Sequence, residues 1–283
     1  MKKIILLAET GSDINKELAT KYGIEIVPMH VSFGDETLDD ASFPSEKICE
    51  YYKSTKKLPK TSGSVPADFI KVFDDIHDKH PEAHILYLAY SSSTTCSFQS
   101  ATVAAVGRDY VTMIDTKQVS MGQAMIVVEM AKFLEANPDT SIEDAVTKAN
   151  ELISKAHMCF MPNNLEFLKA GGRVSNVAFL GSRLLSIHPC IELIDGKLVA
   201  TKKYRGKMET VTKQMLEDYI KAYKLKKDSI WFIYTVGLDE NIKNKLEEIA
   251  KEQGFKEINW LFAAGVITTH GGPSAFGLAG FNE

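Results

Sequence analysis

The chain has 283 residues, of which 45% are hydrophobic and 25% charged, and its formal net charge at pH 7 is −4. This length suits one large domain or two ordinary ones and buries enough surface to fold without disulfide or metal staples. The slightly acidic balance gives no electrostatic reason to expect nucleic acid or another polyanion as a partner.

The cysteines and the N-terminus indicate the compartment. The four cysteines are far apart and form no CxxC pair, so we expect reduced thiols. The apolar run at 4–8 ends at once in Glu9, which is too short for a secretory signal. No apolar run approaches the ~18 residues of a membrane span. We therefore expect a cytoplasmic protein with no transmembrane segment.

In the first half, short apolar runs alternate with amphipathic patterns, which is typical of βαβ units and a largely parallel sheet. The expected strands are 3–7, 24–31, 84–90 and 111–115. The expected helices are 14–22, 45–54, 69–80, 97–107, 121–136 and 140–155. The last of these begins with a capping box formed by Thr140 and Glu143.

The second half has a different pattern. Apolar segments at 191–194 and 198–204 flank Asp195-Gly196, a pair typical of a two-residue hairpin turn. Helices at 208–223 and 240–253 and strands at 230–236 and 258–262 follow. The fold class is thus α/β with two lobes: a Rossmann-like parallel sheet flanked by helices over 1–156, and an α+β lobe over 157–283. Ligand sites favour the interface between such lobes.

Several common catalytic and metal motifs are missing from the sequence. It contains no GxSxG elbow, no GxxxxGK[ST] loop and no HExxH pair. His77, His80 and His84 are close in sequence, but Pro81 interrupts the helix among them, which favours a solvated helix end over a metal site. We expect neither a metal nor a cofactor.

Two hydroxyl-rich segments stand where a ligand could bind. The first, KTSGSVPADF at 60–69, leads into a helix, so Thr61 and Ser62 lie near a helix N-terminus that suits an anion. Its plainer interpretation is N-capping by Ser64. The second, YSSSTTCSFQSA at 90–101, follows a strand at the sheet edge where open α/β proteins bind ligands. Neutral donors of this kind can hold a carboxylate, each bond contributing roughly 1.5–3 kcal/mol.

Two glycine pairs complete the set of candidate segments. In LEFLKAGGRVS at 165–175, Gly171 is expected as a helix C-cap and Gly172 as a tight turn. Arg173 is either a fixed fork for an anion or a brace between the lobes. In ITTHGGPSAFG at 267–277, expected to be a loop, His270 is best interpreted as a hydrogen-bond donor to a carboxylate, with Gly271 allowing close backbone approach.

The order of these motifs resembles that of the DegV family of fatty-acid-binding proteins, from the first strand to the last loop. The most specific part is 165–175, which is similar to the family's LEYLxxGGRIS signature, followed by HGGP at 270–273. The resemblance implies two α/β lobes enclosing a long-chain, palmitate-like fatty acid in an apolar tunnel. It also implies a protein without catalysis of its own, which presents the bound acid to a separate ATP-dependent fatty acid kinase.

The resemblance also assigns residues. The ligand-binding positions it implies, together with the candidates above, are Thr61, Ser62, Ser91, Ser92, Thr95, Arg173, His270 and Gly271. Arg205 matches a basic position associated with kinase docking. The chain departs from the family pattern at 8–10, where AET replaces TDS, and at Gly63 and Cys96.

Two other functions stay open at this point. One is a serine hydrolase or acyltransferase that uses a serine of 91–93 with His270 as base, although no orienting acid is apparent in either segment. The other is an interaction protein whose ligand site has drifted, as the departures at 8–10, 63 and 96 allow. Transient membrane contact is left open as well.

Overall fold

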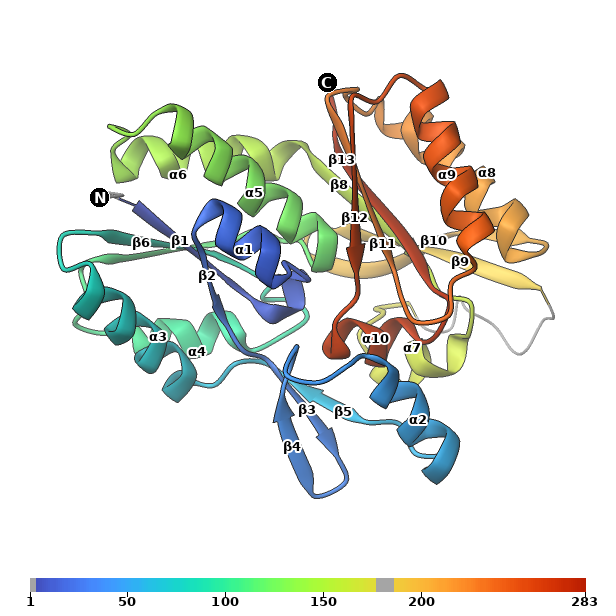
Figure 1. Ribbon diagram of the computed structural model, residues 1–283, viewed down its shortest axis with the longest axis horizontal. Coiled ribbons are helices and arrows are strands. Elements are labelled where there is room, and N and C mark those ends of the chain that lie inside the picture. Colours follow the sequence, from blue (N-terminus) through green and yellow to red (C-terminus); the bar gives the residue numbers. More distant parts are fainter. Residues whose placement is uncertain (1–3, 177–185) are drawn as a thin grey trace.

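Two sheets of different construction lie side by side, each accompanied by helices, with a small third sheet projecting from their junction (Figure 1). The structure is a computed structural model that describes residues 4–176 and 186–283. The two lobes were expected from the sequence and are confirmed, and Lys3, predicted to open the first strand, lies outside the described residues.

The N-terminal sheet is parallel throughout, with the order β2-β1-β6-β7. Its strands are β1 (Ile4–Glu9), β2 (Ile24–Val27), β6 (His84–Ala89) and β7 (Val111–Asp115). Alternate residues of β1 point to opposite faces, as strand geometry requires. Ile4 and Leu6 pack with helix α5 (Ser120–Ala136), whereas Ile5 and Leu7 join the core that holds α3 (Pro66–Lys79) and α4 (Ser97–Ala104). The lobe is therefore a sheet between two helical layers, together with α1 (Lys16–Tyr22) and α6 (Ile142–Lys155).

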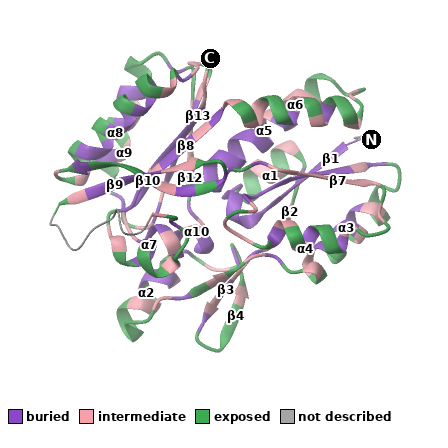
Figure 2. Ribbon diagram, turned by 180° about the vertical axis from the view of Figure 1, so that it is seen from behind, coloured by how far each residue is buried: buried purple, intermediate pink, exposed green. Residues whose placement is uncertain are grey.

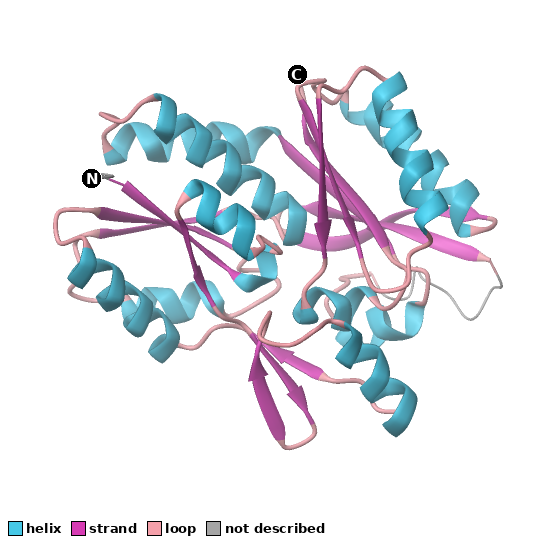
Figure 3. Ribbon diagram, viewed as in Figure 1, coloured by secondary structure: helices cyan, strands magenta, loops and turns pink. Residues whose placement is uncertain are grey.

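The C-terminal sheet is mixed, with the order β10-β9-β8-β13-β11-β12, in which only β11 and β12 pair in parallel. Its strands are β8 (Ala156–Met161), β9 (Ile187–Ile194), β10 (Lys197–Arg205), β11 (Ser229–Tyr234), β12 (Glu257–Phe262) and β13 (Phe276–Phe281). Helices α8 (Met208–Tyr223) and α9 (Glu240–Glu252) cover its outer face (Figure 3). Asp195 and Gly196 form the predicted hairpin turn, both with positive φ (48° and 78°).

Helix α5 serves both sheets. Eleven consecutive or nearly consecutive positions of it are buried, from Ser120 to Ala131. Its side chains share one core with Ile4 and Leu6 of the first sheet and with Trp231 and Ile233 of the second. A helix that is apolar on all sides is expected only where it is buried on all sides. The buried band that runs through both lobes in Figure 2 passes through this helix.

The sequence did not predict the small sheet, order β4-β3-β5, formed by β3 (His30–Phe33), β4 (Glu36–Asp39) and β5 (Lys60–Ser62). The single strand expected over 24–31 is wrong, because the chain leaves the first sheet after Val27 and re-forms as β3 beyond Pro28. Proline has no N–H for the ladder and so marks that break. The neighbouring α2 (Glu46–Thr55) agrees with the predicted helix at 45–54.

The segment 267–277 is not the expected loop. Only its middle part, 272–275, is a loop: 267–271 belong to helix α10 (Gly265–Gly271), and 276–277 begin β13, which lies between β8 and β11 in the middle of the sheet. The sequence did not indicate this strand, because it contains glycines, which are uncommon in strand interiors. One of them is required by packing, since a Cβ on Gly277 would lie 2.6 Å from the methyl carbon of Met121. The capping box predicted at Thr140 and Glu143 is wrong, because the N-cap is Ser141, whose Oγ accepts from the Asp144 N–H.

No helix within 4–176 and 186–283 combines the length and apolar character needed to cross a bilayer.

A buried carboxylate joins three elements of the N-terminal lobe. Glu9, at the end of β1, accepts hydrogen bonds from the Tyr87 hydroxyl, the Tyr90 N–H (3.1 Å) and Gln123 Nε2 (2.7 Å). These donors come from β6, the residue after it, and α5. Burial, opposed only in part by these bonds, raises the pKa of Glu9 to about 7.

Glu9→Gln should therefore flatten the pH dependence of stability. A raised folded-state pKa means that the contribution of Glu9 to stability is fully present below its ordinary pKa of 4.5 and is lost as the pH rises through about 7. Between pH 5 and 8, the wild-type free energy of unfolding should fall relative to that of the variant by up to about 3 kcal/mol. Urea unfolding at several pH values measures this difference. The exposed control Glu25→Gln in β2 should follow the wild type, and parallel curves for wild type and Glu9→Gln would contradict the assignment.

Candidate functional site

A cavity opens where the lobes meet at the N-terminal end of α5. It encloses about 830 Å³ of space, part of which is open to solvent. Its apolar lining is drawn from both lobes and includes Met29, Met121, Met158, Phe160, Leu198 and Ile233. Three of these residues are methionines, whose unbranched side chains adapt to irregular apolar ligands.

One polar contact in the lining of this cavity joins a residue of each lobe. Thr61 Oγ1, on β5, lies 2.8 Å from His270 Nε2, on α10, although the two residues are 209 positions apart. Burial, reinforced by the positive charge of Arg173, lowers the pKa of His270 to about 4. The imidazole is therefore neutral at pH 7, and a neutral imidazole has one N–H donor.

The packing of the His270 ring determines which of its two nitrogens is available for hydrogen bonding in the cavity. Nδ1 is buried without a hydrogen-bond partner among the described residues. A Cβ on Gly171 would lie only 2.2 Å from Nδ1, so the ring packs directly against the backbone of α7 (Leu165–Gly171). Only Nε2 can exchange hydrogen bonds. When Nε2–H donates to Thr61 Oγ1, the threonine hydroxyl can in turn donate its hydrogen to an anion in the cavity.

Arg173 stands at the cavity and also bonds within its own segment. It lines the cavity, and its Nη1 also donates to the Gly171 carbonyl oxygen at 2.6 Å. The turn between them depends on Gly172, which has φ 64° and caps α7. The C-cap predicted at Gly171 is therefore wrong by one residue, since Gly171 is the last residue of the helix.

The two hydroxyl loops touch each other beside the cavity. Thr95, Ser62 and Gly63 all contribute to the lining. A Cβ on Gly63 would lie 2.3 Å from Thr95 Oγ1, so the glycine at this position allows the loops to approach. Ser97 Oγ accepts a hydrogen bond from the Ser64 N–H (3.1 Å), which fixes the approach. The Ser64 side chain does not cap α3, because its Oγ donates to the Pro28 carbonyl oxygen.

The paired serines are not among the residues that line the cavity. Ser91 Oγ donates to the carbonyl oxygen of Gly196 in the other lobe (2.6 Å), and Ser92 Oγ donates to Asp115 Oδ2 (2.6 Å). Arg205 is exposed at the end of β10, also outside the lining, whereas Gly271 is part of it. Of the predicted ligand residues, the structure thus brings together Thr61, Ser62, Thr95, Arg173, His270 and Gly271.

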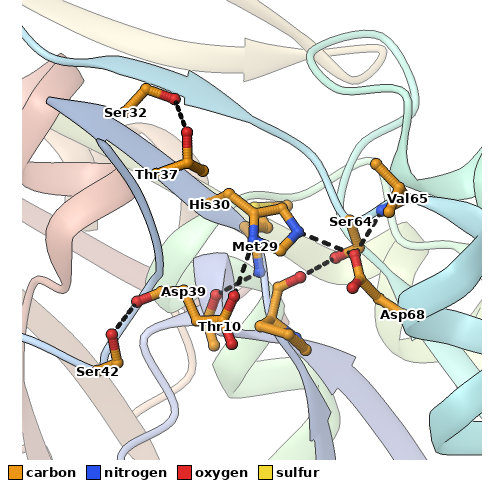
Figure 4. Close-up of polar contacts among 11 residues, drawn as sticks. Thr10, Met29, His30, Ser32, Thr37, Asp39, Ser42, Ser64, Val65 and Asp68 are labelled. Atoms are coloured by element: carbon orange, nitrogen blue, oxygen red, sulfur yellow. Dashed lines mark hydrogen bonds and ion pairs between the residues drawn. The ribbon is translucent and has the colours of Figure 1, made fainter. Parts of the chain in front are cut away.

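His30, together with Asp39 and Asp68, forms a hydrogen-bonded group beside the strand that carries Thr61; we call this group the His30 clamp (Figure 4). His30, which pairs with Ser62 in the small sheet, lies between two carboxylates, 3.0 Å from Asp39 Oδ1 and 2.9 Å from Asp68 Oδ2. Asp68 also accepts from the Val65 N–H at 2.7 Å. His30 therefore connects the small sheet, where it pairs with Ser62, to Asp68 in the first turn of α3. The loop between Ser62 and α3 is thus held at both of its ends.

The sequence analysis missed two buried carboxylates at the start of α10. Asp13 Oδ1 accepts from the Ala264 N–H (2.7 Å), and Asp40 Oδ1 accepts from the Val266 N–H (3.0 Å). Burial raises the pKa of both carboxyls. Their partners lie more than 200 positions away, so no local pattern could have identified them.

No metal site accompanies these residues. Within the part of the chain that the structure describes, no three His, Cys, Asp or Glu side chains converge as ligands. His77 stacks on Tyr110 with ring centroids 4.1 Å apart, and His84 Nε2 contacts Thr112 Oγ1.

Comparison with known proteins places the fold and the motifs in a family. A curated "DegV domain-containing protein" of Caldanaerobacter subterraneus subsp. tengcongensis is 25% identical over 98% of both chains. The solved structure described as "Fatty Acid Binding of a DegV family Protein from Thermus thermophilus" superposes with a TM-score of 0.88, at 27% identity over the whole of both chains. A Streptococcus pneumoniae structure, described as the Fatty Acid Kinase (Fak) B3 protein loaded with linoleic acid, has the same fold, with a TM-score of 0.84 at 17% identity over 99% of this chain and 100% of that one.

The family model described as "Uncharacterised protein, DegV family" matches residues 3–283. This match covers both lobes, the hydroxyl loops and the segment that carries His270. The chain therefore belongs to the DegV family.

Proposed function

We propose that this protein binds a long-chain fatty acid, with the carboxylate at the Thr61 hydroxyl and the acyl chain along the apolar cavity. The observation that carries this proposal is a largely apolar cavity in which Thr61 and His270, one from each lobe, are in hydrogen-bond contact. In this arrangement His270 donates to Thr61, and Thr61 donates to the acid. Ser62 and Thr95 supply further hydroxyls beside it.

The chain and the head group contribute differently to binding. A palmitate-like chain offers ~0.8 kcal/mol per buried CH₂, or about 11 kcal/mol before the cost of association is subtracted. The hydroxyl donors add roughly 1.5–3 kcal/mol per bond to a charged group. The chain therefore supplies most of the affinity, and the donors fix the orientation of the acid. The fatty acid bound by the Thermus thermophilus relative supports the same class of ligand here.

The described contacts give the hydrolase alternative no support. A serine nucleophile needs a base within hydrogen-bond reach and an acid that orients the base. His270 contacts Thr61 instead, while the hydroxyls of Ser91 and Ser92 donate to Gly196 and Asp115. Within the described residues, His270 Nδ1 has no carboxylate partner.

The proposal extends to presentation of the acid to a separate ATP-dependent kinase. A carboxylate held by neutral donors stays nucleophilic, so one of its oxygens can bond to the γ-phosphorus of ATP while the bond to ADP breaks. Arg205 is exposed outside the cavity and is free to meet a partner without blocking the ligand. The kinase subunit named for the Streptococcus pneumoniae protein, which shares the fold, motivates this part of the proposal.

Thr61→Val should weaken palmitate binding by about 10- to 100-fold, because it removes the hydroxyl that donates to the carboxylate and keeps the side-chain shape. Titration calorimetry with delipidated protein measures the change. Thr37→Val is the matched control, because Thr37 is exposed on β4 and contacts Ser32, away from the cavity. The proposal fails if mass spectrometry of the denatured wild type finds no acyl chain and added palmitate does not bind.

Arg205→Ala should leave the palmitate dissociation constant unchanged and slow acyl phosphate formation when the loaded protein is mixed with a fatty acid kinase and ATP. Lys197→Ala, at the other end of the same strand, is the control for loss of a positive charge. Equal rates for wild type and Arg205→Ala would remove Arg205 from the docking surface. No acyl phosphate with the wild type would contradict presentation to that kinase while leaving ligand binding intact.

A further inference from the structure

We infer that Asp13 and Asp40 are positioning residues that keep His270 opposite Thr61, and that they thereby give the cavity its preference for a free acid over an ester. This inference rests on the proposed function. Neither aspartate lines the cavity, so both would act through α10.

The two carboxylates hold the first turn of α10 from the opposite lobe. Asp13 Oδ1 accepts from the Ala264 N–H and Asp40 Oδ1 from the Val266 N–H, at 2.7 and 3.0 Å. Acceptors at this end of a helix satisfy N–H groups that have no partner within the helix. The anchored turn leads directly into the part of α10 that lines the cavity, which comprises Val266, Ile267, His270 and Gly271.

The junction is packed as well as hydrogen-bonded. Ser45 Oγ donates to the Ala263 carbonyl oxygen at 2.7 Å. A Cβ on Gly265 would lie 2.6 Å from the Phe43 ring and 2.9 Å from Asp40 Oδ1. Since the turn has no room to shift, the position of His270 one turn further along α10 is set by these contacts.

Asp13 also reaches the other side of the cavity. Its Oδ2 accepts from Ser120 Oγ at 2.6 Å, and Ser120 is itself part of the lining. Both residues have left-handed backbones, with φ of 60° and 50°, a conformation that non-glycine residues adopt only under constraint. One carboxylate therefore ties the start of α5 to the start of α10.

The hydrogen bonds that these carboxylates accept do not require a negative charge. Neither forms an ion pair with a described residue, and Asp40 Oδ2 is buried with no hydrogen-bond partner among those residues. Asparagine would offer the same acceptor to a backbone N–H without a buried charge. The positioning role thus predicts that Asn substitutes for Asp40 and that Ala does not.

The experiment compares dissociation constants for palmitate and methyl palmitate, which share the chain and differ at the head group. Asp40→Ala should weaken palmitate binding at least about tenfold and methyl palmitate binding less than about twofold, since only the head-group contact is misplaced. Asp40→Asn should keep the wild-type ratio of the two constants. Asp78→Ala, exposed on α3, controls for loss of an aspartate.

A second variant keeps the inference testable if Asp40→Ala does not fold. Gly265→Ala crowds the same junction without removing either carboxyl group, and it should produce the same selective loss of palmitate binding. Equal weakening of acid and ester, or an unchanged ratio in both variants, would overturn the inference while the proposed function stands. A wild type that binds neither ligand would overturn both.

Discussion

Burial of helix α5 between two sheets is the constraint on which the other features depend. Its neighbours lie so close that a Cβ on Gly122 would meet Met158 at 3.1 Å, and one on Gly277 would meet Met121 at 2.6 Å. The shared helix fixes the two lobes relative to each other. The cavity opens beside its first residues, where Val119, Ser120 and Met121 form part of the lining.

Fixed lobes allow residues that are far apart in the chain to meet at the cavity. Thr61 and His270 meet across the junction, and His270 stays neutral because it is buried near Arg173. Under the proposed function, donors held in this way need no reorganisation to bind a carboxylate. On the His270 side of the contact, Asp13 and Asp40 anchor the start of α10. On the Thr61 side, His30 connects the small sheet to α3.

The sequence was informative where structure is set locally. Alternating strands and helices predicted the parallel sheet, and Asp195-Gly196 predicted the hairpin. The motif order identified Thr61 and His270 together, before their contact was known. Two features that depend on distant partners were missed: strand β13, in which Gly277 packs against Met121 of α5, and Asp13, which accepts a hydrogen bond from Ala264. Ser91, which the family resemblance implied as a ligand residue, donates its hydroxyl to a carbonyl oxygen in the other lobe.

The central claim is that a fatty acid lies in this cavity with its carboxylate at Thr61. A crystal structure of the protein grown with palmitate tests it most directly. The account predicts elongated density along Met121 and Met158 that ends in a carboxylate within hydrogen-bond distance of Thr61 Oγ1, with His270 Nε2 still in contact with that hydroxyl. Density with the carboxylate at the opposite end of the cavity, or palmitate bound only on the outer surface, would contradict it.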